Sequence, residues 1–330
     1  MSTTISAIIP TFRREGYLVN TISGMLNQSR RPDEIIVLDQ TPPGEHLPHT
    51  AGYLEARAEH GEITLIELDK PSVFTARNTA LRIAASDVLL YLDDDITPGR
   101  DLVANHLRHY QAADGPAAVV GCVMLYPGEP LCPVPPGFTV RPHVVQSYTF
   151  RANFAEPMRN IGYMCAGNFS VRKESAIAAG GWDEHLLNYS EELCLRLAAI
   201  GCRVDYDPDA RIVHHQAPSG GTRVTDPNNA LPAWERCVSL HYNAFRYLHG
   251  WMFAWYGLFR AARFSFLLKR NFVRPQCWPR ELAGYVKAMV IARRWAKEGV
   301  KSPFVPQTAR CVPQTARCVP RTAPFVRERP

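Results

Sequence analysis

The sequence predicts an α/β protein whose sheet is mostly parallel and flanked by helices, followed by a helical C-terminal appendage. Short apolar runs such as Val88–Leu92 alternate with stretches in which apolar residues recur at helical spacing, as in Phe74–Ala85. A five-residue apolar run bounded by polar residues suits a strand that is covered on both faces. Strands that alternate with helices in this way are typical of βαβ units, which place neighbouring strands in parallel.

The individual elements follow this pattern in chain order. The expected strands are Ile5–Ile9, Glu34–Asp39, Ile63–Leu68, Val88–Leu92, Ala118–Leu125, Arg203–Tyr206 and Arg211–His214. The expected helices are one that ends near Gln28, then Tyr53–Glu59, Phe74–Ala85, Pro98–Tyr110, Tyr189–Leu197 and Arg280–Gly299. Six prolines between Pro127 and Pro142 predict an irregular excursion there, at the boundary between two halves of the domain.

Charge divides the chain into two parts. Residues 1–240 carry a net charge of −8 and residues 241–330 carry +14, within a total of +6. A basic segment favours an anionic partner, and because the sequence shows no zinc-finger, helix-turn-helix or RNP pattern, a membrane surface is favoured over nucleic acid. The aromatic and basic residues of 231–300 fit a pair of interfacial helices, or alternatively a helical cover packed on the sheet. Residues 301–330, which repeat PQTARCV, are expected to form a disordered tail.

Cysteine usage and the first residues bear on the compartment. The nine cysteines show neither CxxC nor Cys/His ligand spacing, which is typical of reduced thiols in a cytosolic protein. The sequence MSTTISAIIPTFRR has no charged region before an apolar core, so we expect no signal peptide. Together with the basic segment, these features predict a cytoplasmic protein that is peripheral on the inner face of the cytoplasmic membrane.

Three consecutive aspartates, Asp93, Asp94 and Asp95, follow the apolar run Val88–Leu92. In open α/β sheets, ligands bind at the carboxyl ends of the strands. Three adjacent carboxylates repel one another unless a cation lies among them, and hard oxygen ligands suit Mg²⁺ or Mn²⁺. The pattern therefore predicts a metal site that also holds a diphosphate, with a solvated turn as the alternative.

The stretch ARNTALRIAASDVLLYLDDD resembles the core of family 2 glycosyltransferases of the GT-A fold, in which an Ala-Arg-Asn helix precedes an Asp-x-Asp motif after a hydrophobic strand. Two later stretches, Tyr163–Lys173 and Gly180–Glu184, resemble a strand and a Gly-Gly-aromatic-Asp-Glu turn of the same family. The resemblance implies a GT-A nucleotide-diphospho-sugar transferase domain over residues 1–230. Its nucleotide-binding half would be residues 1–115 and its acceptor half residues 116–230.

The same resemblance implies which residues contact the nucleotide-sugar, and most of them lie in loops at the sheet edge. They are Pro10, Thr11, Arg13, Asp39, Arg77, Asp93, Asp94 and Trp182. Three of them have alternative interpretations: Asp39 as a turn residue, Arg77 as a surface ion-pair partner and Trp182 as a core aromatic. A dinucleotide-binding fold would show GxGxxG after the first strand, where this chain has Pro-Thr-Phe-Arg-Arg.

The resemblance also implies a third metal ligand. His214 ends a Pro-x-Ala-x-Val-x-His pattern, and a neutral imidazole is a competent ligand beside the carboxylates of Asp93 and Asp95. The loop Ala217–Arg223 follows directly. With two glycines and an arginine, it is a candidate flap over the phosphates.

The catalytic base is the point at which the sequence departs from the family pattern. The base is usually the Asp of a Glu-Asp pair at the start of a helix, and this position falls on Ser190, which cannot take the proton of an acceptor hydroxyl. We therefore expect Glu191 to be the base, with Glu192 as the alternative. Asp183 is expected to bond donor or acceptor hydroxyls, or else to cap its turn.

The sequence thus predicts a metal-assisted, inverting glycosyltransferase. It would move one hexosyl or deoxyhexosyl group from a UDP-, GDP- or dTDP-linked donor to a glycan or polyprenyl-linked acceptor during synthesis of a cell-envelope polysaccharide. Two other classes stay open. A nucleotidyltransferase or a metal-dependent phosphohydrolase could use the same aspartates, and a non-catalytic glycan-binding or membrane-surface protein would explain Ser190.

Overall fold

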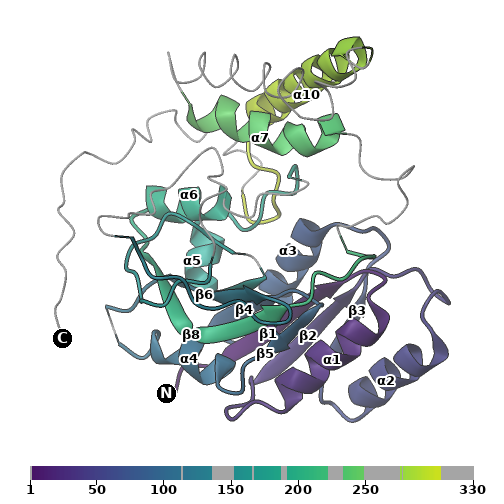
Figure 1. The fold of residues 1–330 in the computed structure, drawn as a ribbon, viewed down its shortest axis with the longest axis vertical. Coiled ribbons are helices and arrows are strands. Elements are labelled where there is room, and N and C mark those ends of the chain that lie inside the picture. The colour runs from purple at the N-terminus through teal and green to yellow at the C-terminus, as the bar shows by residue number, and fades with distance from the viewer. Residues whose placement is uncertain are drawn as a thin grey trace.

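A computed structural model of the chain describes residues 2–112, 114–135, 152–165, 167–186, 192–221, 233–248, 276 and 278–305. They form an α/β domain with two further helices at its C-terminal end (Figure 1). The strands are β1 (Ile5–Thr11), β2 (Glu34–Asp39), β3 (Thr64–Glu67), β4 (Val88–Leu92), β5 (Ile96–Pro98), β6 (Ala118–Leu125), β7 (Asn168–Arg172) and β8 (Val204–His214). The helices are α1 (Glu15–Leu26), α2 (Pro48–Glu59), α3 (Val73–Ile83), α4 (Leu102–Arg108), α5 (Lys173–Ala178), α6 (Glu192–Ala199), α7 (Ala233–Tyr247) and α10 (Trp278–Glu298).

The strands form one eight-stranded sheet in the order β3-β2-β1-β4-β7-β6-β8-β5. The strands from β3 to β4 are parallel to one another, β7 is antiparallel to both of its neighbours, and β6 pairs with β8 in parallel. Because β1, β2 and β4 run in the same direction, their carboxyl ends meet at one edge of the sheet, where Thr11 pairs with Asp39. The predicted α/β class and the helical appendage are therefore confirmed.

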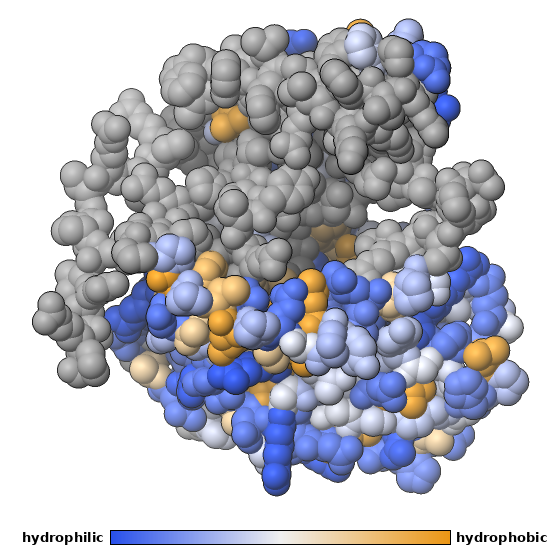
Figure 2. Space-filling view, in the orientation of Figure 1, coloured by the Kyte–Doolittle hydropathy of each residue, from blue (hydrophilic) through white to orange (hydrophobic). Residues whose placement is uncertain are grey.

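The pleat of β4 divides its apolar run between two cores, one on each face of the sheet. Leu89 and Tyr91 belong to the core that α3, α5 and α6 cover, whereas Val88, Leu90 and Leu92 belong to the core that α1, α2 and α4 cover. All five side chains are fully buried. A continuous apolar run is thus explained by helices on both faces. The outer surface over α1 and α2 is mainly hydrophilic (Figure 2).

Three predicted elements, one helix and two strands, were wrong in their bounds. Pro98 does not begin a helix but ends β5, which pairs antiparallel with Ile212–His214, and the helix begins at Leu102. The two strands expected at 203–206 and 211–214 are one strand, β8. Its register to β6 shifts between Gly121 and Cys122, so that residues 208–210 form an irregularity that sequence patterning presents as a break.

The first C-terminal helix, α7, packs against the domain. Tyr242 is fully buried, Phe245 packs against the core of the α3 face, and the hydroxyl of Tyr247 donates a hydrogen bond to Glu192 at 2.6 Å. These three rings were expected at a lipid headgroup level, and the structure instead places them as the alternative helical cover would. No helix of the described ranges has both the length and the apolar content that crossing a bilayer requires. Residues 249–275 of the aromatic segment and the repeats of 306–330 lie outside those ranges.

Candidate active site

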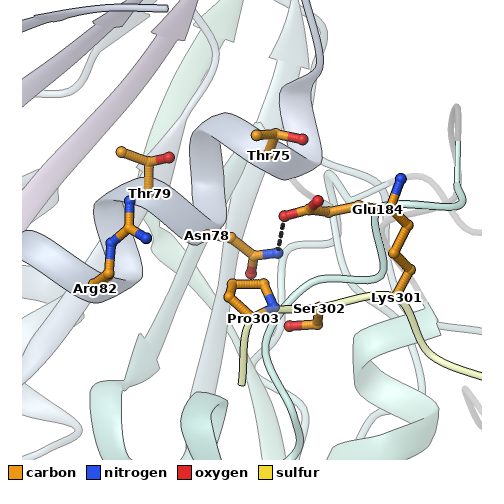
Figure 3. A pocket seen from close by; sticks show the side chains of 8 residues that line it. All are labelled: Thr75, Asn78, Thr79, Arg82, Glu184, Lys301, Ser302 and Pro303. Carbon is orange, nitrogen blue, oxygen red and sulfur yellow. Dashed lines mark hydrogen bonds between the residues drawn. The ribbon is translucent and has the colours of Figure 1, made fainter. Parts of the chain in front are cut away.

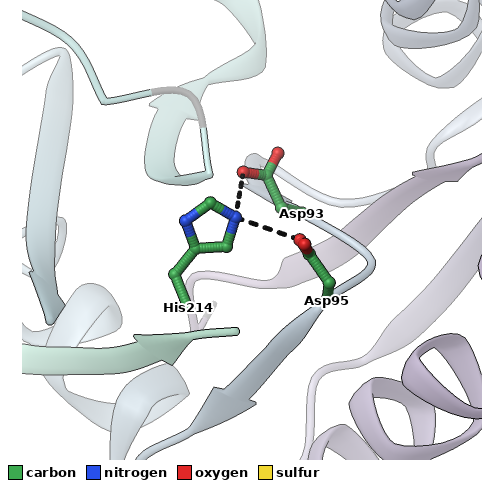
Figure 4. A group of neighbouring side chains, drawn as sticks. All are labelled: Asp93, Asp95 and His214. Atoms are coloured by element: carbon green, nitrogen blue, oxygen red, sulfur yellow. Dashed lines mark hydrogen bonds and ion pairs between the residues drawn. The ribbon is translucent and has the colours of Figure 1, made fainter. Parts of the chain in front are cut away.

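Two carboxylates and an imidazole meet at the carboxyl edge of the sheet. Asp93 and Asp95 follow β4, and His214 is the last residue of β8. The His214 Nε2 atom lies 3.1 Å from Asp95 Oδ1 and 3.8 Å from Asp93 Oδ2, as Figure 4 shows. One ligand atom from each residue lies within 4.8 Å of the others. The structure therefore brings together all three side chains that the sequence predicts as metal ligands.

Arg14 lies among these aspartates, although the sequence analysis assigned it no role. Its Nη1 atom donates to Asp95 Oδ2 at 3.0 Å, and its Nε atom lies 3.3 Å from Asp94 Oδ1. The side chain is buried, and a Cβ added to Gly221 would touch the guanidinium. One buried cation thus offsets part of the negative charge of the three aspartates, and the loop after β8 closes over it.

Burial and neighbouring charge give Asp94 and Asp95 opposite pKa shifts. Burial raises the pKa of Asp94 to about 7, against the lowering effect of the Arg14 guanidinium. Burial also acts to raise the pKa of Asp95, but the His214 imidazole and Arg14 outweigh it and bring the pKa to about 2. Of Asp94 and Asp95, Asp95 is therefore the firmly ionised carboxylate.

Gly167 lies directly against the carboxylate of Asp93. A Cβ added to Gly167 would lie 2.9 Å from Asp93 Cγ and closer still to Asp93 Oδ2. The absence of a side chain at Gly167 therefore leaves space for the carboxylate of Asp93. Its carbonyl accepts a hydrogen bond from the Asp93 amide at 3.3 Å, so β7 fixes the position of the first aspartate.

Behind Gly167, a chain of buried polar groups links β7 to its neighbours. The Asn168 amide donates to Cys122 O at 3.0 Å and to Ala210 O at 2.7 Å, so its oxygen is left to accept from His106 Nε2 at 2.9 Å. The other ring nitrogen, Nδ1, then accepts from Ser170 Oγ at 2.8 Å. Burial lowers the pKa of His106 to about 4, which keeps the ring neutral.

The residues predicted for the nucleotide lie along the same edge. Thr11 is buried, and its Oγ1 atom does not meet the geometry of a hydrogen bond within the described part of the chain. Asp39 is also buried; its Oδ1 atom accepts from the Thr41 amide at 2.9 Å, and its Oδ2 atom lies 2.6 Å from His46 Nε2. Pro10 lies beside Thr11 in β1 and is partly buried. The contacts of Asp39 are those of a turn residue, which is the alternative interpretation given above. Its role toward a nucleotide stays a prediction.

Arg13 points away from the aspartates. Its guanidinium is 52% exposed and forms an ion pair with Glu45 at 2.6 Å, while its amide donates to Thr41 Oγ1 at 3.0 Å. The loop after β2 has a second contact of this kind, because His46 Nδ1 lies 3.2 Å from Oε1 of Glu15, the first residue of α1. Arg13 thus joins the loop after β1 to the loop after β2, and its contact with a nucleotide stays a prediction.

Arg77 and Trp182 stack on each other in the interior. The Arg77 guanidinium lies 4.7 Å from the centre of the Trp182 ring, and both side chains are almost fully buried. The ring centre of Tyr91 lies 5.2 Å from that of Trp182 in an edge-on arrangement. In this conformation Trp182 presents no exposed face to a sugar, which agrees with its alternative interpretation as a core aromatic. The roles predicted for the two residues stay predictions.

Asp183 and Glu192 take part in a buried polar network that holds α7. The Tyr242 hydroxyl donates to Asp183, and Arg246 lies 3.4 Å from Asp183 and 3.5 Å from Glu192. The Arg196 guanidinium donates to Glu192 at 2.7 Å. The network places two carboxylates beside two guanidinium groups and so balances its charge.

The pKa directions in this network are governed by burial and by the arginines. Burial and then the charge of Glu192 raise the pKa of Asp183 to about 6. Burial also acts to raise the pKa of Glu192, but Arg196 and Arg246 hold it below its usual value. A carboxylate stabilised in this way is a weak proton acceptor. Glu191, the first choice for the base, lies outside the described residues together with Ser190.

A separate polar pocket of about 330 Å³ lies between α3 and the chain after α10 (Figure 3). It is lined by Thr75, Asn78, Thr79, Arg82, Glu184, Lys301, Ser302 and Pro303. On its wall, the Asn78 amide donates to Glu184 Oε1 and to Trp182 O, each at 2.9 Å. The pocket contains none of the residues predicted for the nucleotide or the metal.

The fold and the cluster at the sheet edge define the class of the protein, a GT-A domain. The structure is similar to S. aureus TarS 1-349, with a TM-score of 0.52, 15% identity and coverage of 87% of this chain and 81% of that one. It is similar to GalNAc-T7 with UDP, GalNAc and Mn²⁺ (TM-score 0.60, 15% identity, 90% and 56% coverage). It is also similar to the mannosyltransferase PcManGT from Pyrobaculum calidifontis with GDP-Man and Mn²⁺ (TM-score 0.51, 18% identity, 90% and 89% coverage).

Residues 6–179, more than half of the chain, match the sequence profile of Glycosyl transferase family 2, and the protein belongs to that family. A relative named pre-mycofactocin glycosyltransferase, from Mycobacterium tuberculosis, is 29% identical over 142 residues, which are 42% of this chain and 29% of the relative. The O-antigen biosynthesis protein RfbC from Myxococcus xanthus is 25% identical over 236 residues, which are 65% of this chain and 17% of the relative. The chain therefore spans less than a third of the length of these two relatives.

Proposed function

We propose that the protein is a metal-assisted glycosyltransferase that moves one sugar from a nucleoside-diphosphate sugar to a glycan or lipid-linked acceptor. The observation that carries the proposal is the convergence of Asp93, Asp95 and His214 at the carboxyl edge of the sheet. Membership of glycosyl transferase family 2 supports the reaction class. Two of the similar solved structures contain Mn²⁺ together with a UDP or GDP species, which supports the donor class.

The residues present fit a divalent cation. Two carboxylates and one imidazole converge from two strands, and Asp95 is ionised because His214 and Arg14 lower its pKa to about 2. Carboxylate oxygens suit Mg²⁺ and Mn²⁺, and an imidazole is acceptable to Mn²⁺. A cation held by Asp93, Asp95 and His214 would offset the negative charge of the departing nucleoside diphosphate.

Other side chains of the site are suited to the donor. Thr11 Oγ1 and Asp94 Oδ2 are buried and neither meets the geometry of a hydrogen bond within the described part of the chain, although the Thr11 hydroxyl acts to lower the pKa of Asp94. Buried polar atoms are usually paired, so these two atoms are candidates for hydrogen bonds with hydroxyl groups of the donor. Arg14 reduces the repulsion between the aspartates and an approaching diphosphate, because its cation lies beside Asp94 and Asp95.

We assign the proton of the acceptor hydroxyl to Glu191 and expect inversion at the sugar carbon, as in the family that the sequence resembles. The alternative base, Glu192, is bound by Arg196 and Tyr247, which supports a structural role for it. An envelope glycan or polyprenyl-linked acceptor at the inner membrane face is supported by the relative named for O-antigen biosynthesis. Asp183, held by α7, would influence the acceptor only through the position of its turn.

A nucleotide panel tests this function. The thermal midpoint of the full chain is measured with UDP, GDP or dTDP, each with MnCl₂, with MgCl₂ or with EDTA. We expect one diphosphate to raise the midpoint only when the metal is present, and we expect Asp93→Asn to abolish that rise while Glu62→Gln, a control on a distant ion pair with Arg57, retains it.

Product analysis then separates the reaction classes. Incubation with the sugar-linked form of the bound nucleotide should release nucleoside diphosphate slowly, with water as the acceptor. Consumption of a nucleoside triphosphate with release of pyrophosphate would instead show a nucleotidyltransferase. Release of inorganic phosphate alone would show a phosphohydrolase, and either result would contradict the proposal.

A further inference from the structure

Helix α10 has an exposed apolar stripe. Leu282, Val286 and Val290 are 45%, 53% and 65% exposed. They are four residues apart, so they lie along one side of the helix. The other side faces α7, and its residues Tyr285 and Ala288 are buried. Helix α10 lies beyond α7 when seen from the sheet (Figure 1).

The grouping of these side chains distinguishes α10 from the rest of the described surface. The other large hydrophobic residues that are exposed occur singly, at or beside different elements: Leu47, Ile83, Tyr126, Ile177 and Ile200. Single exposed apolar residues are ordinary on a protein surface. A row of three on one helix forms a contiguous apolar patch, and such patches mark surfaces that bind a protein or a membrane.

Cations accompany the stripe. Lys287, Arg293, Arg294 and Lys297 of α10 are all exposed. At 100° per residue, these four positions project on the same half of the helix as Leu282, Val286 and Val290. Among the described side chains, Glu298 is an acid beside these cations, and its carboxylate lies 3.7 Å from Arg294. The exposed half of α10 therefore carries an apolar stripe together with cations, three of which, Arg293, Arg294 and Lys297, lie in its last two turns.

We propose that this half of α10 docks on the surface of an anionic lipid bilayer, with the helix in the plane of the interface. The aliphatic side chains would lie at the boundary between headgroups and acyl chains, and the cations would contact lipid phosphates. The occupant is inferred from charge, because an anionic leaflet attracts Lys and Arg side chains that flank the apolar face of an interfacial helix. Three aliphatic side chains are also far fewer than the roughly 20–30 residues that each partner contributes to a stable dimer.

The membrane partner of the proposed function would thus bind α10, which lies within the basic segment 231–300 that the sequence suggested for interfacial helices. The proposal names a surface for that partner and so rests on the proposed function for its biological meaning. Its test uses neither donor nor acceptor. Failure of lipid binding and failure of sugar transfer are therefore separate results.

Sedimentation with vesicles tests the proposal on the full chain. Vesicles of phosphatidylcholine alone are compared with vesicles that contain one part phosphatidylglycerol to two parts phosphatidylcholine. We expect binding to the anionic vesicles and little to the neutral ones. Neutralising Arg293 and Lys297 to Gln should weaken that binding about fivefold for each cation removed. The double change Val286→Asp and Val290→Asp should weaken it at least tenfold, because the apolar contact is lost.

The matched control is Ile200→Asp, which changes an aliphatic residue with 48% exposure just after α6 and should leave vesicle binding unchanged. Since all these side chains are exposed, equal thermal midpoints are expected and exclude unfolding as the cause of any loss. Equal binding by the double Asp variant and the wild type would overturn the proposal. It would also be overturned if the chain ignored anionic vesicles but formed a dimer in light scattering that Val290→Asp dissociated.

Discussion

Replacing Gly167 by alanine adds one methyl group beside Asp93 at the metal site. The new methyl group would lie 2.9 Å from Asp93 Cγ, whereas carbon atoms prefer a separation of about 3.5 Å or more. The carboxyl group of Asp93 must therefore move by about 0.6 Å or turn away. Metal sites tolerate ligand displacements of only about 0.2 Å, so Asp93 would no longer complete the cluster with Asp95 and His214.

We expect Gly167→Ala to lower the Mn²⁺ affinity of the protein about 10- to 100-fold, which is the usual effect of disturbing the support of a metal ligand. The assay is a titration with Mn²⁺ followed by electron paramagnetic resonance, in the absence of nucleotide. The control is Gly52→Ala, because no heavy atom lies within 4 Å of the added methyl group at that helical position. A Gly167→Ala protein with wild-type Mn²⁺ affinity would refute the assignment of Asp93 as a ligand.

Three further outcomes follow from buried polar groups. Burial lowers the pKa of His106 to about 4, whereas an unfolded imidazole titrates near 6.5. The stability difference, defined as the free energy of unfolding of the wild type minus that of His106→Gln, should therefore fall by about 3 kcal/mol as the pH drops from 7 to 4. The difference is measured by urea titration, and a value that does not change with pH would contradict a buried neutral ring. Tyr247→Phe removes a hydrogen bond to ionised Glu192 and should lower the free energy of unfolding by about 2 kcal/mol, and an unchanged value would show that the bond contributes nothing. Arg14→Met leaves two buried aspartates without their cation and should lower the free energy of unfolding by about 3 kcal/mol, and MnCl₂ should recover part of that loss. The control is Arg30→Met at a surface ion pair, which should lower the free energy of unfolding by less than about 1 kcal/mol. Equal losses in the two arginine variants would contradict the buried ion pair.

The His106 measurement is taken as a difference between two proteins because another group titrates in the same window with the opposite sign. Burial and the charge of Glu192 raise the pKa of Asp183 to about 6. The stability that protonated Asp183 contributes is present below its unfolded pKa of about 4 and is lost as the pH rises through 6. The His106 contribution is present above pH 6.5 and is lost as the pH falls. Subtraction cancels the Asp183 contribution, since both proteins contain it.

The sheet edge could be predicted from sequence because its signals are local. An apolar run that stops at three aspartates locates a strand and its carboxyl end, and a parallel topology then places Asp39 and Thr11 at the same edge. His214 could be named because the Pro-x-Ala-x-Val-x-His pattern before it resembles that of the family, and the structure places it at the end of β8. The strand ends follow from the order of the elements, which the fold confirms, whereas the choice of His214 as a ligand came from the resemblance.

Arg14 could not be separated from Arg13 in this way. The two residues are adjacent and chemically alike, and the backbone decides which of them enters the site. Arg13 has a φ of 55° and Glu15 a φ of 37°, so the chain turns sharply on both sides of Arg14 and directs it inward. The amide of Gly221 then donates to Phe12 O at 2.7 Å and closes the loop after β8 over it. This closure joins segments two hundred residues apart, which no local pattern reveals.

The environment of Glu192 was equally hidden. An acid at the start of a helix is typical both of a catalytic base and of a residue that only stabilises the helix. The decisive contacts come from Arg246 and Tyr247 of α7, more than fifty residues further along the chain. Trp182 is a similar case, because its stacking with Arg77 depends on the packing of α3 against the Gly180–Glu184 turn.

The central claim, that a cation held by Asp95 and its neighbours assists sugar transfer, is tested most directly by one comparison. The rate at which nucleoside diphosphate is released from the matching donor is measured with MnCl₂ and with EDTA, for the wild type, Asp95→Asn and His214→Gln. We predict that the wild-type rate in MnCl₂ exceeds the other rates at least about 100-fold, with folding of each variant verified by its thermal midpoint. Full release in EDTA, or in a folded Asp95→Asn protein with MnCl₂, would contradict the claim.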